Sequence, residues 1–396
     1  MTTTHTSSPR RRRSRQQLLE VIRREGGVTR NDLRLLTGLS RSAVAEAVQD
    51  LLDERLVSED LLAPGGKGAG RGRPSALLVA TPSTGLVVGL DFGHEHIAVG
   101  VADTSGTVLA QQWLDVGVDE DPQRSLDAAC GAATRLLAQI GRSPGQVRAV
   151  AAGIPAPIDP DTQRVRRDSV LPAWADVDIR DELGARFGAP VVVENDATMG
   201  ALGERRFGAA RGLRDIVYVK ASEGIGAAVL LGGAVHRGSG GLSGEIGHLR
   251  LADNGLWCRC GNRGCLETVL SSQLVERRVR DARLHCPDPV HPLRSCADDP
   301  VVSAFVTEAG RTLGRVLADL CTWINPSGLV LGGVLGSAGA PMIEGVRESV
   351  ARFTPLTVSE GLDIRTAQLG LRSELLGCVA TAIQEALLLS SAEGAA

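Results

Sequence analysis

One stretch of the chain, residues 241–267, restricts the fold and the chemistry more than any other. It reads G-L-S-G-E-I-G-H-L-R-L-A-D-N-G-L-W-C-R-C-G-N-R-G-C-L-E and holds one histidine, three cysteines and two glutamates. Imidazole nitrogen and thiolate sulfur are the donors that tetrahedral Zn²⁺ prefers, and four protein ligands leave no open coordination position. The pattern therefore predicts a structural zinc ion, with free thiols as the alternative. The candidate ligands are His248, Cys258, Cys260 and Cys265.

Length and composition set the frame for this loop. A chain of 396 residues exceeds one ordinary core, so two or three domains are expected. Glycine is abundant, at 48 residues, and aromatic residues make up only 3%, which favours an α/β fold with many tight turns. No apolar run is long enough to span a membrane, and no apolar segment follows the basic N-terminus, so a cytoplasmic protein is expected.

The remaining cysteines are scattered along the chain. They do not form the close, regular spacing of a disulfide framework, and a metal together with free thiols is the better interpretation. We expect them to be small buried apolar side chains. They are Cys130, Cys286, Cys296, Cys321 and Cys378. The irregular segment 284–302, which includes His291, is expected to be a surface loop and not a second zinc site.

Charge is distributed unequally between the two ends of the chain. Residues 1–80 carry 14 Lys and Arg against 9 Asp and Glu, and the remainder carries 29 against 37. A basic head on an acidic body points to a polyanionic partner for the head alone. Residues 1–14 form either a disordered solubilising tail or an arm that adds phosphate contacts.

Residues 15–80 have the pattern of a winged helix-turn-helix domain. A helix from residue 15 to 24 is followed by a helix that begins after Thr29 and ends at Gly38, and Ser40 caps a third helix. A strand-like segment, a basic glycine-rich segment and a second strand then form the expected wing. A bundle that serves only protein interactions is the alternative.

The candidate DNA contacts lie on the third helix and on the wing. Small and polar residues at the start of a recognition helix can approach base edges, and arginines on a flexible wing can enter a minor groove. The candidates are Arg41, Ser42 and Ala45 on the helix, and Lys67, Arg71 and Arg73 on the wing.

The body carries further motifs in a fixed order. Residues 87–103 read as a strand, a turn and a strand; residues 149–159 as a strand and a loop; and residues 191–204 as a strand, the polar triplet E-N-D and a helix. V-Y-V-K-A-S-E-G-I-G at 217–226 and L-V-L-G-G at 329–333 follow. With the G-E-I-G-H and C-x-C-G-x-x-G-C-x-E motifs, this set resembles the ROK family of repressors and sugar kinases over essentially the whole chain.

The resemblance implies a two-lobed actin-like, ribonuclease-H-like fold. The first lobe would span residues 81–200, the second would span residues 201–372 with the zinc loop, and a last helix at 373–390 would pack back on the first lobe. The resemblance also places the sugar contacts of the family on five residues: Asn195, Asp196, Glu245, His248 and Glu267. Pro155-Ala156-Pro157 departs from the P-G-P common in the family.

The same resemblance marks where a kinase would act and where this chain departs from it. Asp196 would be the general base that takes the proton of the attacking sugar hydroxyl. Family kinases typically read D-x-G-G-T and G-T-G-x-G at their two phosphate loops, and this chain reads D-F-G-H-E and S-E-G-I-G. Both threonines are replaced by glutamates, Glu95 and Glu223, and carboxylates near a phosphate oppose nucleotide binding.

These observations predict a sugar-responsive DNA-binding regulator, more specifically a repressor that binds operator DNA as a homodimer or larger homo-oligomer. Its body would bind a sugar or sugar derivative beside a structural zinc ion and would have lost kinase activity, with Asp196 a vestigial base. A sugar kinase with an appended DNA-binding head is the alternative, and a constitutive DNA-binding protein whose body only dimerises is a third.

Overall fold

The computed structural model describes residues 28–54, 56–61, 76–81, 85–282 and 296–393, with scattered residues between 11 and 22 and three between 286 and 293. Contacts divide the chain into two units. One comprises residues 1–86, 103–107 and 383–396, and the other comprises residues 87–102 and 108–382. Among the described residues, no helix is both long enough and apolar enough to cross a membrane.

The N-terminal part, residues 1–80, is called the head. Its described elements are α2 (Arg30–Thr37), α3 (Arg41–Asp53), β1 (Val57–Leu61) and β2 (Ala76–Ala80), and the described residues between 11 and 22 are also helical. The predicted caps are confirmed. Thr29 forms a capping box with Asp32, and the Ser40 side chain accepts from the Ala43 amide. Gly38 ends α2 with a φ of 68°, which only glycine adopts without strain. The apolar faces of these elements share one core, which includes Leu18, Ile22, Leu33, Val48, Leu51 and Leu78.

Strands β1 and β2 pair antiparallel, from Val57 with Ala80 to Leu61 with Ala76. The glycine-rich basic segment between them, with Lys67, Arg71 and Arg73, lies outside the described residues, as does most of the tail at 1–14. The described strand pair has the antiparallel arrangement that a hairpin wing requires.

The body is built around two five-stranded sheets with the same order of strands. The first runs β5-β4-β3-β6-β7 and the second runs β10-β9-β8-β11-β12. The strands of the first sheet are β3 (Leu86–Phe92), β4 (His96–Asp103), β5 (Val108–Asp115), β6 (Val147–Ile154) and β7 (Val191–Asn195). Those of the second are β8 (Ile216–Ala221), β9 (Ile225–Leu231), β10 (Ala234–His236), β11 (Gly328–Gly332) and β12 (Asp363–Thr366).

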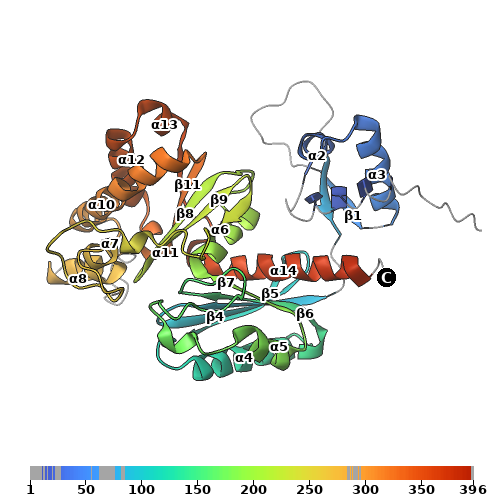
Figure 1. Ribbon diagram of the computed structural model, residues 1–396, viewed down its shortest axis with the longest axis horizontal. Helices are drawn as coiled ribbons and strands as arrows, with labels where there is room; N and C mark the ends of the chain where they lie inside the picture. The colour runs from blue at the N-terminus through green and yellow to red at the C-terminus, as the bar shows by residue number, and fades with distance from the viewer. Residues whose placement is uncertain are drawn as a thin grey trace, which may run out of the picture. The chain divides into compact units, whose positions relative to one another are not determined.

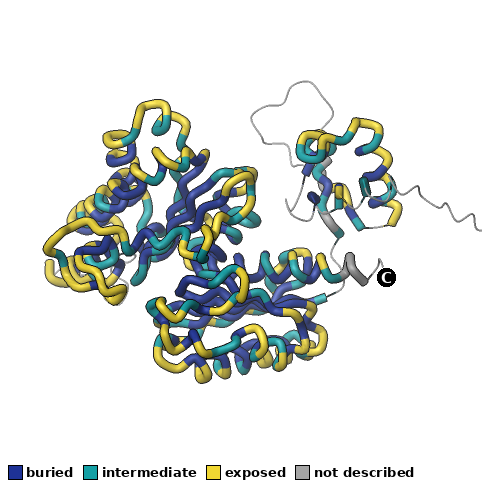
Figure 2. Tube along the Cα trace, viewed as in Figure 1, coloured by how far each residue is buried: buried dark blue, intermediate teal, exposed yellow. Residues whose placement is uncertain are grey.

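Helices cover both faces of each sheet (Figure 1). The first sheet lies between α4 (Pro122–Gln139) and α5 (Ile179–Phe187) on one face and α14 (Ser373–Glu393) on the other. The second sheet has α6 (Asp196–Phe207) on one face, and α8 (Ser272–Asp281), α10 (Pro300–Ile324) and α12 (Ala340–Phe353) on the other. We call the first sheet with α4 and α5 the first lobe, and the second sheet with its helices the second lobe. The central strands of both sheets, such as β3, β4 and β11, are deeply buried, whereas the edge strands β5, β10 and β12 are partly exposed (Figure 2).

Alternation along β8 explains why its sheet is covered on both faces. Val217 and Val219 point into a core shared with α10 and α12, whereas Ile216 and Tyr218 point into a second core shared with α6. Every residue of this strand is buried except Lys220, which is partly exposed. The short helices of the body are α7 (Leu266–Val269), α11 (Gly333–Gly336), α13 (Leu356–Gly361), η1 (Pro144–Gln146), η2 (Pro172–Trp174), η3 (Ile246–His248) and η4 (Gly370–Arg372).

Helices α6 and α14 approach each other at two glycines. A Cβ atom at Gly377 would lie 1.7 Å from the Met199 carbonyl oxygen, and one at Gly203 would lie 2.3 Å from the Ser373 carbonyl oxygen. Both distances are far below van der Waals contact, so only glycine fits either position. This crossing brings the start of α14 against Gly203 and Glu204 in the C-terminal half of α6, and Gly377 against Met199 in the N-terminal half.

The structure corrects one expectation about cysteine. Cys286 and Cys296 are joined by a disulfide and are not separate thiols. Their Cα atoms lie 5.5 Å apart, within the range that a disulfide spans, although ten positions separate them in the sequence. Cys130, Cys321 and Cys378 are free and buried, as expected.

Candidate functional site

The order of strands in both sheets determines where a ligand can bind. In each sheet the strand that comes first along the chain (β3 or β8) lies beside the strand that comes fourth (β6 or β11). The chain continues from the first of these strands toward one edge of the sheet and from the other toward the opposite edge. A crevice forms at such a point beyond the carboxyl ends of the strands. The chain has a cavity of about 420 Å³ there, of the size that small ligands occupy. It is lined from the first lobe by residues after β3, β6 and β7, and from the second by residues at or after β8 and β11.

All five residues expected to contact a sugar line this cavity: Asn195, Asp196, Glu245, His248 and Glu267. Asn195 caps α6, since its side-chain oxygen accepts from the Thr198 amide at 3.1 Å. Its amide nitrogen donates to the Ala156 carbonyl at 3.3 Å and so joins α6 to the Pro155-Ala156-Pro157 loop. The fold therefore gathers carboxylates, an amide and an imidazole, which are groups able to exchange hydrogen bonds with hydroxyls.

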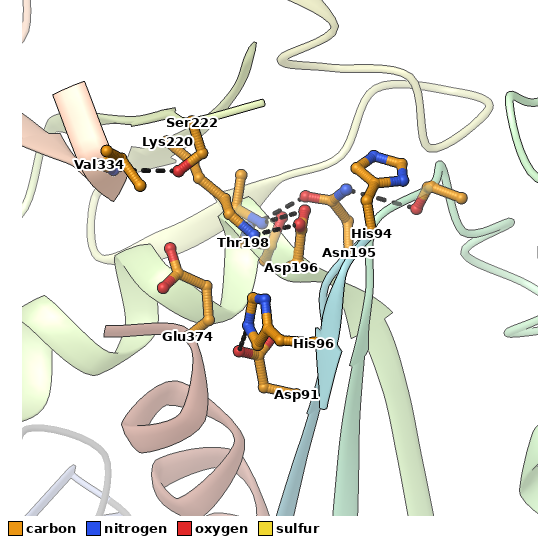
Figure 3. Close-up of polar contacts among 12 residues, drawn as sticks. Asp91, His94, His96, Asn195, Asp196, Thr198, Lys220, Ser222, Val334 and Glu374 are labelled. Atoms are coloured by element: carbon orange, nitrogen blue, oxygen red, sulfur yellow. Dashed lines mark hydrogen bonds and ion pairs between the residues drawn. The ribbon is translucent and has the colours of Figure 1, made fainter. Parts of the chain in front are cut away.

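Asp196 is not a free carboxylate. The Lys220 ammonium donates to its Oδ2 at 2.6 Å, and the Ala197 amide donates to its Oδ1 at 2.7 Å. Both side chains are nearly buried, with 12% of Lys220 and 10% of Asp196 exposed. Burial opposes the charge of Lys220, but Asp196, Glu374 and Asp91 outweigh it and raise the pKa of the lysine. Figure 3 shows Lys220 and Asp196 pointing toward each other.

Three further groups complete a charged cluster around Lys220. Burial raises the pKa of Glu374, on the first turn of α14, to about 7, and the Tyr218 hydroxyl donates to its carboxylate at 2.8 Å. His96 lies 3.3 Å from Oδ2 of the buried Asp91, and Oδ1 of Asp91 has no hydrogen-bond partner. Gly93 makes room for this histidine, because a Cβ there would lie 2.2 Å from the His96 ring.

Glu245, which also lines the cavity, is affected by two neighbouring carboxylates. Burial, Asp196 and Glu267, in that order, raise the pKa of Glu245 to about 7. Near neutral pH this carboxyl group is present in both protonation states, so it can donate to or accept from a hydroxyl.

The candidate metal ligands come together as expected. The ligand atoms of His248, Cys258, Cys260 and Cys265 all lie within 4.8 Å of one another. Cys258 Sγ is 3.5 Å from His248 Nδ1, and Cys260 Sγ is 3.7 Å from Cys265 Sγ. A tetrahedral zinc ion with ordinary bond lengths holds its sulfur ligands about 3.8 Å apart and its sulfur and nitrogen ligands about 3.5 Å apart. The donor set and its spacing therefore fit zinc.

The backbone of the zinc loop (residues 248–265) explains two of its three internal glycines. Gly264 has a φ of 68°, and a Cβ there would lie 1.9 Å from the Ala252 carbonyl oxygen. Gly261 has a φ of 89°. Since Nδ1 of His248 faces the sulfurs, its Nε2 points the other way, 3.8 Å from Glu245 Oε2. The imidazole thus stands between the cysteines and the cavity.

The residues at which this chain departs from the phosphate-loop motifs of the resembling kinases also line the cavity. They are His94, Glu95 and Glu223. Burial, followed by the charge of Glu95, raises the pKa of Glu223. The charge of Glu95 therefore acts on Glu223 within the cavity.

In the head, Arg41, Ser42 and Ala45 are exposed on the first turns of α3. Their side chains are thus accessible on the face opposite the buried Val44 and Val48. This is the placement expected of a recognition helix.

Sequence reasoning missed Lys220, Asp91, His96, Glu374 and Arg259. Lys220 had a recognisable signal, since a lysine interrupts an otherwise apolar strand and the chain has only one other lysine, Lys67. Glu374 had none, because 178 positions separate it from Asp196 in the sequence and only the crossing of α6 and α14 brings them together.

Three comparisons bear on this architecture. The model of the ROK family matches residues 87–385. The xylose repressor of Bacillus subtilis (strain 168) is 29% identical over 362 residues, which cover 91% of this chain and 92% of the repressor. The solved structure of a ROK family transcriptional regulator, described as a homologue of the Escherichia coli MLC protein, covers 95% of this chain and 98% of its own, with a TM-score of 0.71 and 22% identity.

A kinase is also among the similar structures. A ROK family glucokinase from Streptomyces griseus, solved with glucose and AMPPNP, has a TM-score of 0.64 and 29% identity. It covers 76% of this chain and 100% of its own, whereas the xylose repressor and the regulator structure cover more than 90% of this chain.

Proposed function

This chain belongs to the ROK family, and we propose on that premise that it is a transcriptional repressor whose DNA binding responds to a sugar or sugar derivative. The similarity to the xylose repressor extends over 91% of the chain, whereas the glucokinase structure covers 76%. The head has two capped helices and a strand pair of the kind that a winged helix-turn-helix uses, and it is the basic part of the chain.

The observation that carries this proposal is the ion pair between Lys220 and Asp196. A general base must accept a proton from the sugar hydroxyl. Asp196 already accepts from a buried ammonium at 2.6 Å, and its protonation would leave the charge of Lys220 without its closest partner. An unpaired buried charge costs about 3–5 kcal/mol. The pair favours a cavity that holds a sugar without phosphorylating it.

The glutamates at the phosphate loops support the same conclusion. A carboxylate about 4 Å from a phosphate repels it by about 1 kcal/mol in water and by about 4 kcal/mol at an effective dielectric constant of 20. Glu95 and Glu223 both line the cavity, so both would oppose a bound nucleotide.

We propose that His248, Cys258, Cys260 and Cys265 hold a structural zinc ion. The ion would bind Nδ1 of His248 and fix the ring so that Nε2 is presented to the sugar. When bound, zinc supplies only cross-linking of the loop, because the four ligands complete its coordination. Asn195, Asp196, Glu245 and Glu267 would provide the other sugar contacts.

The coupling between sugar and DNA would follow from differential affinity. If the sugar prefers one arrangement of the two lobes and the operator prefers another, binding at one site changes affinity at the other. We propose a homodimer or larger homo-oligomer that reads a palindromic operator in the cytoplasm, because two-fold symmetry of the protein matches two half-sites of DNA.

Gel-shift titration with upstream genomic fragments tests the proposal. We expect a specific complex at moderate salt that one member of a sugar panel alters. The absence of a specific complex under all conditions, with and without sugars, would contradict a repressor.

A sugar kinase with a DNA-binding head is the second candidate, supported by the similarity to glucokinase and by the presence of Asp196. ADP release from Mg-ATP and a sugar panel distinguishes the two. Turnover that disappears in Asp196→Asn would favour the kinase. Calorimetry that detects no sugar binding at millimolar concentration would favour a constitutive DNA-binding protein.

A further inference from the structure

Two consecutive residues of the first lobe contact the second lobe at the cavity. Arg259, in the zinc loop, donates from Nη2 to His94 Nε2 at 3.3 Å. Gln273, on α8, donates from Nε2 to Glu95 Oε1 at 3.4 Å. His94 and Glu95 are the residues that replace the glycine and threonine of the first kinase phosphate loop. The departure from the kinase pattern has therefore introduced two contacts between the lobes.

One tautomer of His94 satisfies all of its contacts. Its Nδ1 lies 2.7 Å from Asp119 Oδ1, so a proton on Nδ1 donates to that carboxylate and leaves the lone pair of Nε2 to accept from Arg259. The His94 side chain is 12% exposed. Arg259 also lies 3.9 Å from Asp119 through Nη1. Asp119 thus fixes the ring in the orientation that meets the guanidinium.

Arg259 connects this contact to the expected sugar and metal sites. It stands between Cys258 and Cys260 in the sequence, and its Nε donates to Glu267 Oε1 at 3.3 Å. One guanidinium therefore touches a carboxylate assigned to the sugar and a histidine of the opposite lobe.

The turn between β8 and β9 lies beside the contact between Arg259 and His94. A Cβ at Gly224 would lie 3.5 Å from Glu267 Oε2 and 3.6 Å from both Arg259 Nη2 and His94 Nε2. The backbone at Gly224 thus lies next to the three side chains, at a distance that a methyl group would fill.

We propose that His94 and Glu95, together with Arg259 and Gln273, form a clasp between the lobes that takes the place of a nucleotide. The clasp holds the cavity closed around the sugar alone, and Arg259 is a positioning residue that orients Glu267. The ligand part of this inference rests on the proposed function, whereas the contacts between the lobes do not.

A double-mutant cycle tests the clasp without any ligand. His94→Ala, Arg259→Ala and the double variant are compared by melting temperature and by hydrogen exchange, with zinc content measured in each. Because the two side chains share one contact, the loss in the double variant should be smaller than the sum of the single losses. Hydrogen exchange of the backbone amides of residues 93–96, in the first lobe, should be faster in Arg259→Ala than in the unaltered protein. Arg263→Ala is the matched control, since Arg263 belongs to the same loop but stacks on Trp257, 4.0 Å from the ring centre.

Calorimetry with D-xylose and D-glucose as probes tests the ligand part. For whichever probe binds, Arg259→Ala and Gln273→Ala should weaken binding by about tenfold, the effect of losing one hydrogen bond to a charged group. Arg263→Ala should bind as the unaltered protein does.

The outcomes separate the two proposals. Additive losses with unchanged exchange at 93–96 would overturn the clasp. If the losses of melting temperature were coupled but the protein bound neither D-xylose nor D-glucose, nor any other sugar of the panel, the clasp would be supported and sugar sensing would be contradicted. Equal sugar affinity in all variants would overturn the role of the clasp in holding the ligand.

Discussion

Lys220 is the residue on which the charge balance of the cavity depends. Nearly all basic residues of the chain are arginines, and its two lysines are Lys67 and Lys220. An ammonium is a compact point charge, whereas a guanidinium is a broad planar fork. Only the compact group suits a position between Asp196, Asp91 and Glu374, which all favour its charge.

Replacing Lys220 by methionine should destabilise the protein by about 3–5 kcal/mol, because it leaves buried carboxylates without their cation. Urea unfolding measures the loss. The double variant Lys220→Met/Asp196→Asn should recover part of it, since it removes one of the uncompensated charges. If the double variant were less stable by the full sum of the single losses, the two side chains would not be coupled.

Glu374 should give the protein a dependence of stability on pH. Its pKa is raised to about 7, mainly by burial, with Asp91 acting in the same direction and Lys220 and the Tyr218 hydroxyl opposing it. The folded protein therefore binds this proton more tightly than the unfolded chain does. The contribution is fully present below pH about 4.5 and is lost as the pH rises through about 7. Urea midpoints at pH 5 and pH 8.5 should differ less in Glu374→Gln than in the unaltered protein; an equal difference would exclude Glu374 as the source.

At the scale of elements, the crossing of α6 and α14 builds the floor of the cavity. Helix α6 presents Asn195 and Asp196 at its start, and α14 presents Glu374 on its first turn. Their separation is set by Gly203 and Gly377, where backbone meets backbone.

Gly377→Ala should therefore move the two helices apart. The added methyl group would lie 1.7 Å from the Met199 carbonyl oxygen, and such overpacking costs about 1–3 kcal/mol or more. Thermal unfolding measures the cost, and sugar affinity should fall with it. Gly361→Ala is the control, because a Cβ there meets nothing within 4 Å. Equal melting temperatures for the two variants would show that the crossing is not tightly packed.

The zinc loop should lose its metal when one ligand is removed. Cys260→Ser should reduce bound zinc from about one ion per chain to near zero and lower the melting temperature, because the binding free energy of a structural metal is also folding free energy. Metal analysis of the purified protein and a melting curve measure both. Cys321→Ala, a buried free cysteine outside the loop, should keep its zinc. Full zinc content in Cys260→Ser would remove that residue from the ligand set.

The sequence predicted local features well and long-range contacts poorly. Thr29 and Ser40 predicted the helix starts, because the cap is a hydrogen bond to a backbone amide only three positions further along the chain. The ligands around Cys258 could be grouped because they lie close together along the chain. The partner of Lys220 and the contact between His94 and Arg259 depend on how distant segments pack, and no local pattern encodes that. The disulfide between Cys286 and Cys296 is closer along the chain, but two cysteines ten positions apart do not by themselves indicate that they pair.

At the scale of the whole molecule, the head and the body carry charges of opposite sign. A basic head concentrates the attraction for DNA in one part of the chain, and an acidic body repels non-specific contact elsewhere.

DNA binding by the head should therefore depend steeply on salt. With about six phosphate contacts, affinity should fall by about 10³ between 50 and 200 mM salt. Fluorescence anisotropy with an operator fragment measures the slope. Arg41→Ala should weaken DNA binding and leave sugar affinity unchanged, since the residue lies on α3 of the head. Binding that does not respond to salt would exclude phosphate contacts as its main source.

The ion pair at the centre of the cavity has a consequence for what the protein can report. A dissociable metal ion is present in proportion to its concentration in the surrounding solution, but the ammonium of Lys220 is covalently part of β8 and is always present. On the proposed function, in which glutamates stand in place of the nucleotide contacts, neither free magnesium nor the ratio of ATP to ADP would enter the occupancy of the cavity. Such a sensor would respond to the abundance of one nutrient and would be insensitive to the energy state of the cell that contains it.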